Sequence, residues 1–387
     1  MEYVGQMRTR SYRLAGDLAI WPFILCLPFM YAPRVLGGDT QPWIIITALL
    51  ALLAYRPTKF VSKRDLPVLF LAGLAIVVYA VRSDNGYFII RNAYIYIAFI
   101  VFWIIASRGG QEYFSIGIRW TIVVWFLIGA YQYIAIHLGY TINPPGRYLA
   151  GRMGPPSITA EASYYGSISM VQLMFLLSEK PRKGNGIFAS FAFASVLMSG
   201  SLLSMLLLIF PLLRLPKVYK WTVAIVLPAL IVLDYLNTST GVASRLVHIF
   251  SDGFTLDGML QDASLNLRAG HIYFTMIAHF WGSFFLVSPI DFMRQYNHFA
   301  DASGVLIHTG TNYILPSIGQ MVYGAGFIGV AVAALLLHRA QETCDSFSRK
   351  IEKTLFILAC LFNPISIANP FLIIYARQRM RAESPIN

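Results

Sequence analysis

The chain has 387 residues, of which 57% are hydrophobic and only 12% are charged, and its formal net charge is +12. The charged fraction is about half that of a soluble domain. A water-soluble fold could not bury so much apolar surface, so lipid must be the solvent for most of the chain. No polar linker divides it. Composition therefore predicts one all-α, polytopic membrane domain over residues 1–387, rather than a set of soluble domains.

The apolar runs of the sequence have the composition of membrane spans. The basic N-terminal segment, Met1–Arg13, precedes the first run, and a second run follows almost at once, which predicts an uncleaved first helix. Together the runs predict about 11 or 12 crossings. They fall near residues 17–33, 42–54, 66–81, 92–106, 117–138, 164–178, 186–200, 201–213, 221–236, 311–337 and 354–376.

Lys and Arg set the orientation of these spans, because positive charge is retained in the cytoplasm. With the N-terminus inside, most basic residues, and every Lys, fall on the inner face. This bias predicts a multi-pass protein of the bacterial inner membrane. The outer face keeps only arginines, namely Arg34, Arg82, Arg91, Arg147, Arg152, Arg245, Arg268 and Arg294.

The last run, 354–376, is interrupted by Asn363-Pro364 and Asn369-Pro370. A single crossing would place the basic cluster Arg377–Arg381 outside, so a broken C-terminal hairpin with the Asn-Pro pairs at its tip is predicted. The alternative makes 272–288 a full span, which would expose the basic residues between the last two runs on the outer face.

Two outer segments are long enough to carry a site, since long ordered loops usually carry function. The first is 139–160. The second is 237–310, a large periplasmic loop that contains an amphipathic stretch at 272–288 suited to lie along the membrane surface.

The outer arginines suggest phosphate binding, because guanidinium grips phosphate with a fixed bidentate fork. Arg34, Arg82 and Arg91 are interpreted as solvated loop residues. A ligand role is favoured for the four arginines of the two large segments, which are Arg147, Arg152, Arg245 and Arg268.

Glu161 is the only glutamate on the outer face, and it precedes an apolar run. One interpretation is a carboxylate that stabilises a helix N-terminus. The other is a carboxylate at a membrane-level cavity that acts as a base or orients a basic group.

Three stretches resemble the O-antigen polymerase (Wzy) family and its wider superfamily with the O-antigen ligases. Arg152-Met-Gly-Pro-Pro-Ser-Ile-Thr-Ala-Glu-Ala-Ser-Tyr-Tyr-Gly166 resembles the polymerase outer-loop signature, although Ala162 replaces the usual Pro. Ser264-Leu-Asn-Leu-Arg-Ala-Gly-His271 resembles the start of the second large periplasmic loop. His308-Thr-Gly-Thr-Asn-Tyr-Ile-Leu315 with Gly324-Ala-Gly-Phe-Ile-Gly329 resembles the segment that leads into the next helix. Together the stretches cover well under half of the chain.

The resemblance implies a GT-C-like, inverting, metal-independent glycosyltransferase. Such an enzyme moves a growing glycan from undecaprenyl pyrophosphate onto a second lipid-linked repeat unit at the periplasmic face. It implies a bilayer and undecaprenyl-pyrophosphate-linked oligosaccharides as partners, together with a chain-length regulator and a flippase.

The outer residues can be placed in this chemistry. Arg152 and Arg268, with Arg147 and Arg245, would stabilise the charge on the leaving pyrophosphate. His308 is the first candidate for the base that activates the acceptor hydroxyl, Glu161 the second and His298 the third. Candidates for sugar binding are Tyr148, Tyr164, Tyr296, Tyr313 and Asn312, although tyrosine is also a common interface anchor.

The sequence carries no motif for a cofactor, metal or nucleotide site. Cys26, Cys344 and Cys360 have no disulfide or metal spacing. No Asp-x-Asp, His-Glu-x-x-His or phosphate loop is present. The Gly-x-Gly-x-x-Gly at 324–329 follows no strand, so close helix packing is the better interpretation. No metal, cofactor or nucleic-acid partner is expected.

Two other functions remain open. An O-antigen ligase uses the same donor but transfers the glycan to lipid A core, and the sequence separates it poorly from a polymerase. A transporter or flippase for lipid-linked sugars would suit the proline-broken run 354–376. The large one-sided outer loop and the scarcity of charge within the spans disfavour transport.

Overall fold

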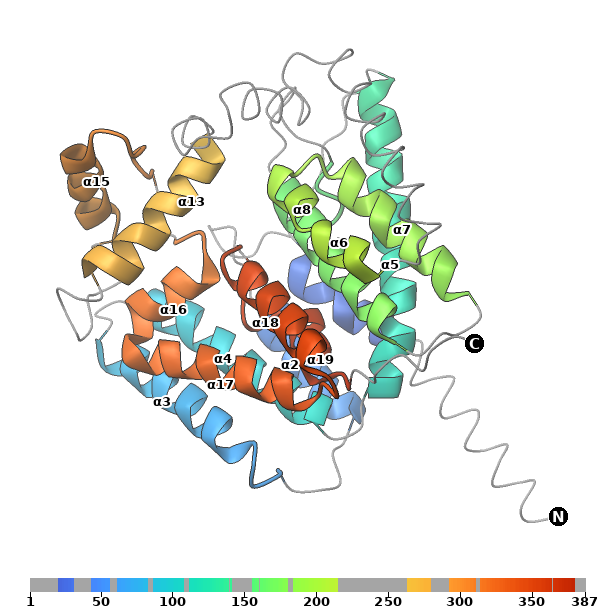
Figure 1. The fold of residues 1–387 in the computed structure, drawn as a ribbon, viewed down its shortest axis with the longest axis horizontal. Coiled ribbons are helices and arrows are strands. Elements are labelled where there is room, and N and C mark those ends of the chain that lie inside the picture. The colour runs from blue at the N-terminus through green and yellow to red at the C-terminus, as the bar shows by residue number, and fades with distance from the viewer. Residues whose placement is uncertain are drawn as a thin grey trace.

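A computed structural model describes residues 20–30, 43–55, 61–82, 86–107, 111–138, 140, 155–159, 161–179, 184–214, 263–279, 292–310, 314–363 and 365–379. These ranges are helical and contain no strand, which confirms the predicted all-α class (Figure 1). The elements are η1 (Leu27–Phe29), α2 (Trp43–Tyr55), α3 (Leu66–Arg82), α4 (Gly86–Ser107), α5 (Gln111–His137), α6 (Ala162–Ser178), α7 (Asn185–Met198), α8 (Leu202–Leu206), α9 (Ile209–Arg214), α13 (Ala263–Tyr273), η2 (Phe274–His279), α15 (Phe292–Ser303), α16 (Ser317–Ala325), α17 (Phe327–Glu342), α18 (Phe347–Leu361) and α19 (Pro370–Arg377).

Helix α6 lies inside the bundle and is covered by α7, α8 and α19. It is buried on every face over most of its length, as expected for a helix without an apolar stripe. Small residues permit this close contact. A Cβ added at Gly166 would come within 2.3 Å of the Ser199 hydroxyl. Helix α6 is therefore the central element against which the others pack.

Helix α5 exposes an apolar face from Trp120 to its C-terminal end. The large exposed side chains recur at helical spacing, which places them on one stripe: Trp120, Val124, Leu127, Tyr131, Ile134 and Leu138. At 27 residues the helix is ~40 Å long. Its segment Phe114–Ile136 is the one segment in the described ranges that is both long and apolar enough to cross a membrane, and several shorter apolar helices accompany it.

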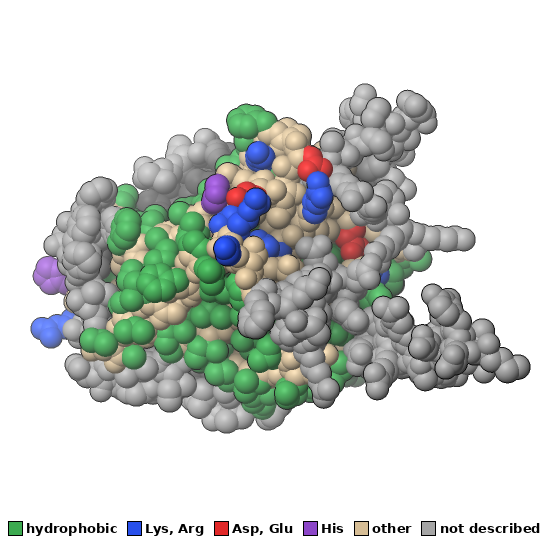
Figure 2. Space-filling view, turned by 90° about the horizontal axis from the view of Figure 1, so that it is seen from below, with side chains coloured by type: hydrophobic (Ala, Val, Ile, Leu, Met, Phe, Trp, Pro, Cys, Tyr) green, Lys and Arg blue, Asp and Glu red, His purple; other side chains and the backbone are tan. Residues whose placement is uncertain are grey.

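The charged side chains gather on one part of the surface, beside a broad apolar area (Figure 2). Six ion pairs among the described residues involve basic residues that the charge bias predicts on the inner face: Arg119–Glu179, Arg214–Glu352, Arg339–Glu342, Arg349–Glu352, Arg377–Asp65 and Arg379–Asp345. These pairs join residues that are far apart in sequence, such as Arg214 with Glu352 and Arg377 with Asp65.

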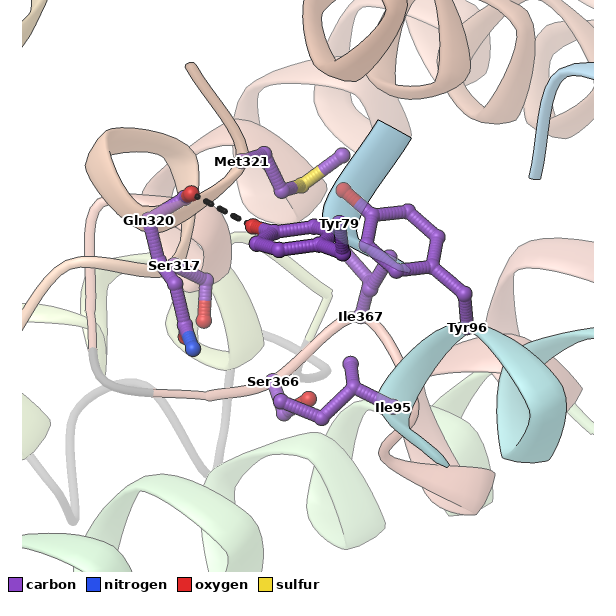
Figure 3. Close-up of a pocket in the computed structure, with 8 residues that line it drawn as sticks. All are labelled: Tyr79, Ile95, Tyr96, Ser317, Gln320, Met321, Ser366 and Ile367. Carbon is purple, nitrogen blue, oxygen red and sulfur yellow. Dashed lines mark hydrogen bonds between the residues drawn. The ribbon is translucent and has the colours of Figure 1, made fainter. Parts of the chain in front are cut away.

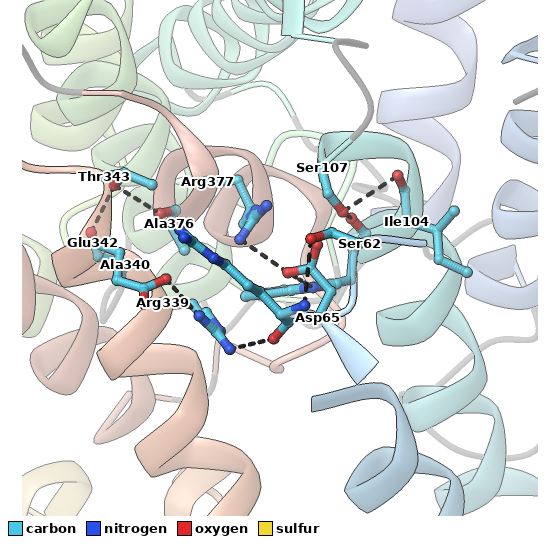
Figure 4. Close-up of polar contacts among 12 residues, drawn as sticks. Ser62, Asp65, Ile104, Ser107, Arg339, Ala340, Glu342, Thr343, Ala376 and Arg377 are labelled. Carbon is cyan, nitrogen blue, oxygen red and sulfur yellow. Dashed lines mark hydrogen bonds and ion pairs between the residues drawn. The ribbon is translucent and has the colours of Figure 1, made fainter. Parts of the chain in front are cut away.

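Asp65 is the centre of one of these networks (Figure 4). Its carboxylate is almost fully buried, accepts from the Trp103 indole at 3.2 Å, and lies 3.2 Å from the Arg377 guanidinium. The Arg339 guanidinium donates to the Arg64 carbonyl next to it. A buried carboxylate needs such partners to offset its loss of hydration. The contacts fix the end of α19 against the start of α3.

The run 354–376 is divided between α18 and α19, with Asn363 and Asn369 in the connection. Asn369 caps α19, because its side-chain oxygen accepts from the backbone N–H groups of Phe371 and Leu372. At the other end, the Lys353 amine donates to the Gln378 carbonyl at 2.8 Å. The end of this run therefore lies beside its beginning.

The run 311–337, predicted as one span, is broken into α16 and α17. Gly326 makes the break with a φ of 54°, a conformation that side chains disfavour. Gly329 permits α17 to pack closely against α16, because a Cβ at this position would lie only 2.1 Å from the Met321 carbonyl oxygen. The prediction of close helix packing at these glycines is confirmed, and that of a single helix is wrong.

Candidate functional site

The predicted site residues divide into two groups. The structure describes Glu161, Tyr164, Arg268, His298 and His308. Six others lie outside the described residues, namely Arg147, Tyr148, Arg152, Arg245, Asn312 and Tyr313. The geometry below therefore concerns the first group.

Arg268, His298 and His308 belong to one substructure, which we call the outer module: α13, η2, α15 and the segment 304–310. It lies at one corner of the fold beside α16 (Figure 1). It has its own small core, in which aromatic rings from α13, η2, α15 and α16 meet. The module thus holds three predicted site residues on a rigid support.

His271 joins the parts of the outer module. Its ring is fully buried and meets the rings of Phe292 and Tyr296 edge-on, at 4.9 and 4.7 Å. Its Nδ1 accepts from the Leu315 N–H at 3.2 Å, so Nε2 carries the proton of the neutral ring. Burial and, secondarily, the charge of Arg268 lower the pKa of His271 to about 3. The residue is therefore a neutral contact between α13, α15 and the start of α16.

Arg268 lies one turn before His271 on α13 and is itself buried, with 9% of its surface exposed. A buried guanidinium is stabilised by anions, and its planar fork suits phosphate oxygens. The structure places this predicted phosphate ligand inside the module rather than on a solvated loop.

The segment 304–310 forms a strap that returns along α15. Gly304 begins it with a φ of 68°. The Asn297 side chain donates to the Thr309 carbonyl at 3.1 Å and accepts from the Thr309 N–H at 2.8 Å. The Tyr296 hydroxyl donates to the Ile307 carbonyl at 3.1 Å. Side chains of α15 thus supply the backbone hydrogen-bond partners that a neighbouring strand supplies in a sheet.

Asn266 on α13 holds the other half of the strap. Its amide nitrogen donates to the Val305 carbonyl, and its oxygen accepts from the Ile307 N–H, both at 3.0 Å. Two buried or half-buried asparagines and one tyrosine therefore fix the backbone on either side of His308.

His308 projects from the strap and pairs with Asp301 of α15, with 2.7 Å between Nε2 and the carboxylate oxygen. The two side chains are 58% and 68% exposed. An ionised carboxylate only accepts hydrogen bonds, so the neutral tautomer that fits this contact donates from Nε2 and carries its lone pair on Nδ1. This arrangement is that of a histidine base oriented by an acid.

Two other candidates, Tyr296 and His298, lie in surroundings that differ from each other. Tyr296 is fully buried within the module, where its hydroxyl donates to the Ile307 carbonyl, so its ring faces the core rather than the surface. His298 is exposed on α15 and has no hydrogen bond to a described residue. His308, with its carboxylate partner, is the better base.

Glu161 lies outside the module, at the start of α6, and Tyr164 follows it, half-buried against the main core. Glu161 is the N-cap residue, but its side chain makes no capping hydrogen bond. The Ser163 hydroxyl donates to its carboxylate at 3.2 Å. The cap interpretation therefore explains the position of Glu161 but not the direction of its side chain.

The turn before Glu161 is built around Ser157, which has a φ of 53° and is fully buried. The Gln132 side chain bonds both the N–H and the carbonyl of Ser157, at 2.8 and 2.9 Å. The Ser157 hydroxyl donates to the Trp125 carbonyl at 3.1 Å. A non-glycine residue in this conformation costs free energy, so the surrounding contacts impose it.

The α18–α19 connection lies between the Glu161 turn and the outer module. On one side, at the start of α19, which directly follows the connection, the rings of Phe371 and Trp125 meet edge-on with 6.4 Å between their centroids. On the other, the carbonyls of Asn363 and Ile365 accept from the Ser317 N–H and hydroxyl, at 3.2 and 2.5 Å. Since Leu315 next to α16 binds His271, contacts run continuously from one candidate region to the other.

A small, mostly apolar pocket opens beside this connection (Figure 3). The Tyr79 hydroxyl donates to the Gln320 carbonyl across it, at 3.2 Å. The space open to the centre of a water molecule is only about 10 Å³, room for about one water. The pocket is too small for a sugar or a phosphate. It is lined by Tyr79, Ile95, Tyr96, Ser317, Gln320, Met321, Ser366 and Ile367.

Four residues that shape these regions were not singled out from the sequence: Asn266, His271, Asn297 and Asp301. Their roles depend on partners from other elements, which spacing alone does not show. For Asp301, the glycine after α15 and the seven-residue separation from His308 are the signals that could have indicated a return of the chain.

No three His, Cys, Asp or Glu side chains of the described ranges are arranged to hold a metal ion. Neither a protein-family model nor a curated protein sequence matches this chain.

Proposed function

We propose that this protein is a multi-pass glycosyltransferase of the bacterial inner membrane. It polymerises glycan by transfer from undecaprenyl pyrophosphate onto a lipid-linked repeat unit at the periplasmic face. The observation that carries the proposal is the exposed His308–Asp301 pair on a fixed strap, in the same small module as the buried Arg268.

Membrane embedding is supported by the surface of the bundle. On α3, Phe70, Val77 and Val81 are exposed by 70%, 54% and 79%, and α5 carries the longer stripe described above. Soluble monomers rarely expose contiguous apolar areas of this kind. The grouping of inner-face charges at one end of the bundle agrees with the orientation inferred from the sequence.

The proposed reaction is a single displacement. The acceptor hydroxyl oxygen attacks the anomeric carbon, and its proton passes to Nδ1 of His308, while Asp301 stabilises the resulting imidazolium. The bond from the anomeric carbon to the pyrophosphate oxygen breaks, and its electron pair leaves with the pyrophosphate. Arg268 stabilises this charge without a metal ion. Attack opposite the leaving group inverts the anomeric centre.

Glu161 and the arginines of 139–160 are assigned to the donor side of the same site. The contacts through the α18–α19 connection support this grouping, because they link the Glu161 turn to the module that bears Arg268. Glu161 remains the second candidate base.

The test is complementation of a host that lacks its own polymerase, with surface polysaccharide resolved on a gel. Wild type should restore a ladder. Arg268→Ala and His308→Ala should reduce it to a single repeat, and Asp301→Asn should shorten it, because loss of general base catalysis costs ~10²–10⁴-fold in rate.

The matched control is His338→Ala. His338 is also an exposed histidine beside a carboxylate, 60% exposed and 3.6 Å from Glu342, but at the charged end. It should leave the ladder unchanged. Loss of even the single capped repeat in the His308 variant would indicate a ligase, and a full ladder in all variants would refute the proposed site.

A further inference from the structure

The turn that precedes α3, residues 62–65, is fixed by contacts from its own chain and from α17. The Ser62 carbonyl accepts from the Asp65 N–H at 2.8 Å, and the Ser62 hydroxyl accepts from the Arg64 N–H at 3.3 Å. From α17, the Arg339 guanidinium donates to the Arg64 carbonyl. The buried network around the Asp65 carboxylate holds the end of the turn (Figure 4). The backbone of the turn is therefore a rigid support for its side chains.

This turn carries two cations. Lys63 and Arg64 are both exposed. Among the residues that the structure describes, neither side chain makes a hydrogen bond or an ion pair. Arg339 and Arg377, by contrast, are paired with carboxylates. The turn therefore offers two positive charges to a partner from outside the bundle.

The end of α17 adds to the positive charge around the turn. The pKa of the Glu342 carboxyl is lowered, first by its hydrogen bond from Arg339 and further by the charges of His338 and Arg64. Arg64 thus lies within electrostatic range of the end of α17. We call Lys63, Arg64, His338, Arg339 and Glu342 the α3–α17 cluster. It has three permanent cations and one carboxylate, so it carries an excess of positive charge.

The helix that follows the turn has an exposed apolar stripe. Leu66 and Phe70 are 53% and 70% exposed, and Val77 and Val81 continue the stripe at helical spacing. Leu66 is only two residues away from Arg64 in the chain. Figure 2 shows Lys and Arg side chains gathered beside a broad apolar area. A ligand at the start of α3 therefore meets positive charge and apolar surface together.

We propose that the α3–α17 cluster binds the headgroup of an anionic phospholipid, whose phosphodiester is not balanced by an ammonium group. The phosphate accepts from the Arg64 guanidinium and from the Lys63 amine, and an acyl chain lies along Leu66 and Phe70. The inference rests on the proposed membrane embedding and on the inner-face orientation of this turn, but it does not depend on glycosyl transfer.

An anionic lipid fits this place better than a soluble phosphate or an acidic protein segment does. Basic residues at the cytoplasmic ends of spans bind anionic headgroups. The exposed stripe of α3 offers an apolar contact that a soluble anion cannot use. A zwitterionic lipid carries its own ammonium group, which the excess positive charge of the cluster repels.

The experiment is native mass spectrometry of the full chain in detergent micelles, titrated separately with phosphatidylglycerol and with phosphatidylcholine. Wild type should bind at least one phosphatidylglycerol about tenfold more tightly than phosphatidylcholine, because only the first has a net negative headgroup. Lys63→Gln and Arg64→Gln should each weaken this binding about fivefold, because each removes one cation beside the headgroup. Lys63→Arg keeps the charge and should retain the binding.

Lys350→Gln is the matched control. Lys350 is an exposed lysine of α18, next to the exposed Ile351 in the chain. The cation on its other side, Arg349, pairs with Glu352, so this position has one unpaired charge instead of two. The variant should leave the preference for phosphatidylglycerol unchanged.

The outcomes separate the lipid site from the proposed function. Equal binding of the two lipids, or an equal loss in Lys350→Gln, would overturn the site. Displacement of the lipid by an equal concentration of glycerophosphoglycerol, the same headgroup without acyl chains, or of an acidic peptide would overturn it in favour of a soluble anion or a protein partner. A preference lost only in the Lys63 and Arg64 variants, in a protein that yields no polysaccharide ladder, would establish the lipid site and refute polymerisation.

Discussion

Helices α5 and α15 place opposite kinds of side chain on their surfaces. On α5, Leu127 and Tyr131 are 59% and 68% exposed, whereas Thr121 and Gln132 are buried. On α15, Phe292 and Tyr296 are fully buried, whereas Asp301 is exposed. One helix has its polar groups inside and the other has them outside. The two helices therefore present opposite kinds of surface, as the proposed membrane embedding of α5 requires.

The difference explains where chemistry can be placed. A polar group that faces lipid has no water to bond with. If the exposed stripe of α5 faces lipid, as proposed, its polar groups can act only on the opposite, buried face. A helix with a polar outer face can present charged and titratable groups to solvated substrates. The outer module has this second pattern, and it bears the His308–Asp301 pair.

The largest effect is expected from removing a buried phenylalanine, and an exposed phenylalanine is the control. Phe292→Ala should destabilise the outer module by ~3–5 kcal/mol, because it leaves a cavity between the rings of its core. Phe70→Ala on α3, where the ring is 70% exposed, should cost less than ~1 kcal/mol. Unfolding in bicelles and exchange within 292–310 would measure both. Equal costs would contradict the assignment of inside and outside.

The next test introduces a charge. Leu127→Lys places an amine near the middle of the apolar segment of α5 and should cost ~2.5–3.5 kcal/mol in a bilayer. Ala302→Lys on α15 should cost less than ~0.5 kcal/mol. The amount of each protein inserted and folded in the membrane gives the comparison. If Leu127→Lys is tolerated as well as Ala302→Lys, the α5 stripe does not face lipid.

A pH dependence should be confined to the outer module. The pKa of His271 is lowered to about 3 from 6.5, so between these values the unfolded chain binds a proton that the folded module does not. Stability is then complete above pH 6.5 and falls with pH by ~1.4 kcal/mol per unit, or ~2 kcal/mol by pH 5. Exchange in 263–279 at pH 7 and pH 5 measures this.

His271→Gln is the matched variant for that measurement, since it keeps a polar side chain but does not titrate. Its module should be less stable at pH 7 yet lose less stability between pH 7 and pH 5. A slope equal to that of the wild type would show that another group opens the module.

The sequence predicts much of this contrast because composition and charge act along the whole chain. Apolar runs predict helices, and the basic residues predicted on one face include Arg377 and Arg379, which pair with Asp65 and Asp345. Composition does not predict the helix break at Gly326, because the run around it is uniformly apolar.

The candidate site is less predictable, because it depends on single bonds between distant residues. His308 is found from a resemblance, but the strap that holds it depends on Asn266, which is 41 positions away from Ile307. Nothing in local composition distinguishes this asparagine from others. Likewise, the left-handed conformation at position 157 could not be predicted, because the residue there is serine and not glycine.

That turn gives the smallest expected effect. Ser157→Ala loses the hydrogen bond to the Trp125 carbonyl and keeps the unfavourable φ of 53°. Ser157→Gly loses the same bond but relieves ~1–2 kcal/mol of backbone strain, against ~0.5–1 kcal/mol of added chain entropy in the unfolded state.

Glycine should therefore be more stable than alanine here by ~0.5–1 kcal/mol, the reverse of the usual order. Unfolding of the two variants in the same bicelles measures the difference. Alanine equal to or better than glycine would mean that Ser157 does not hold a left-handed turn. If glycine is the more stable residue, as expected, the turn before Glu161 is strained and is held by its contacts with Gln132 and Trp125. Both residues lie on the buried face of α5, the face on which polar groups of this helix can act.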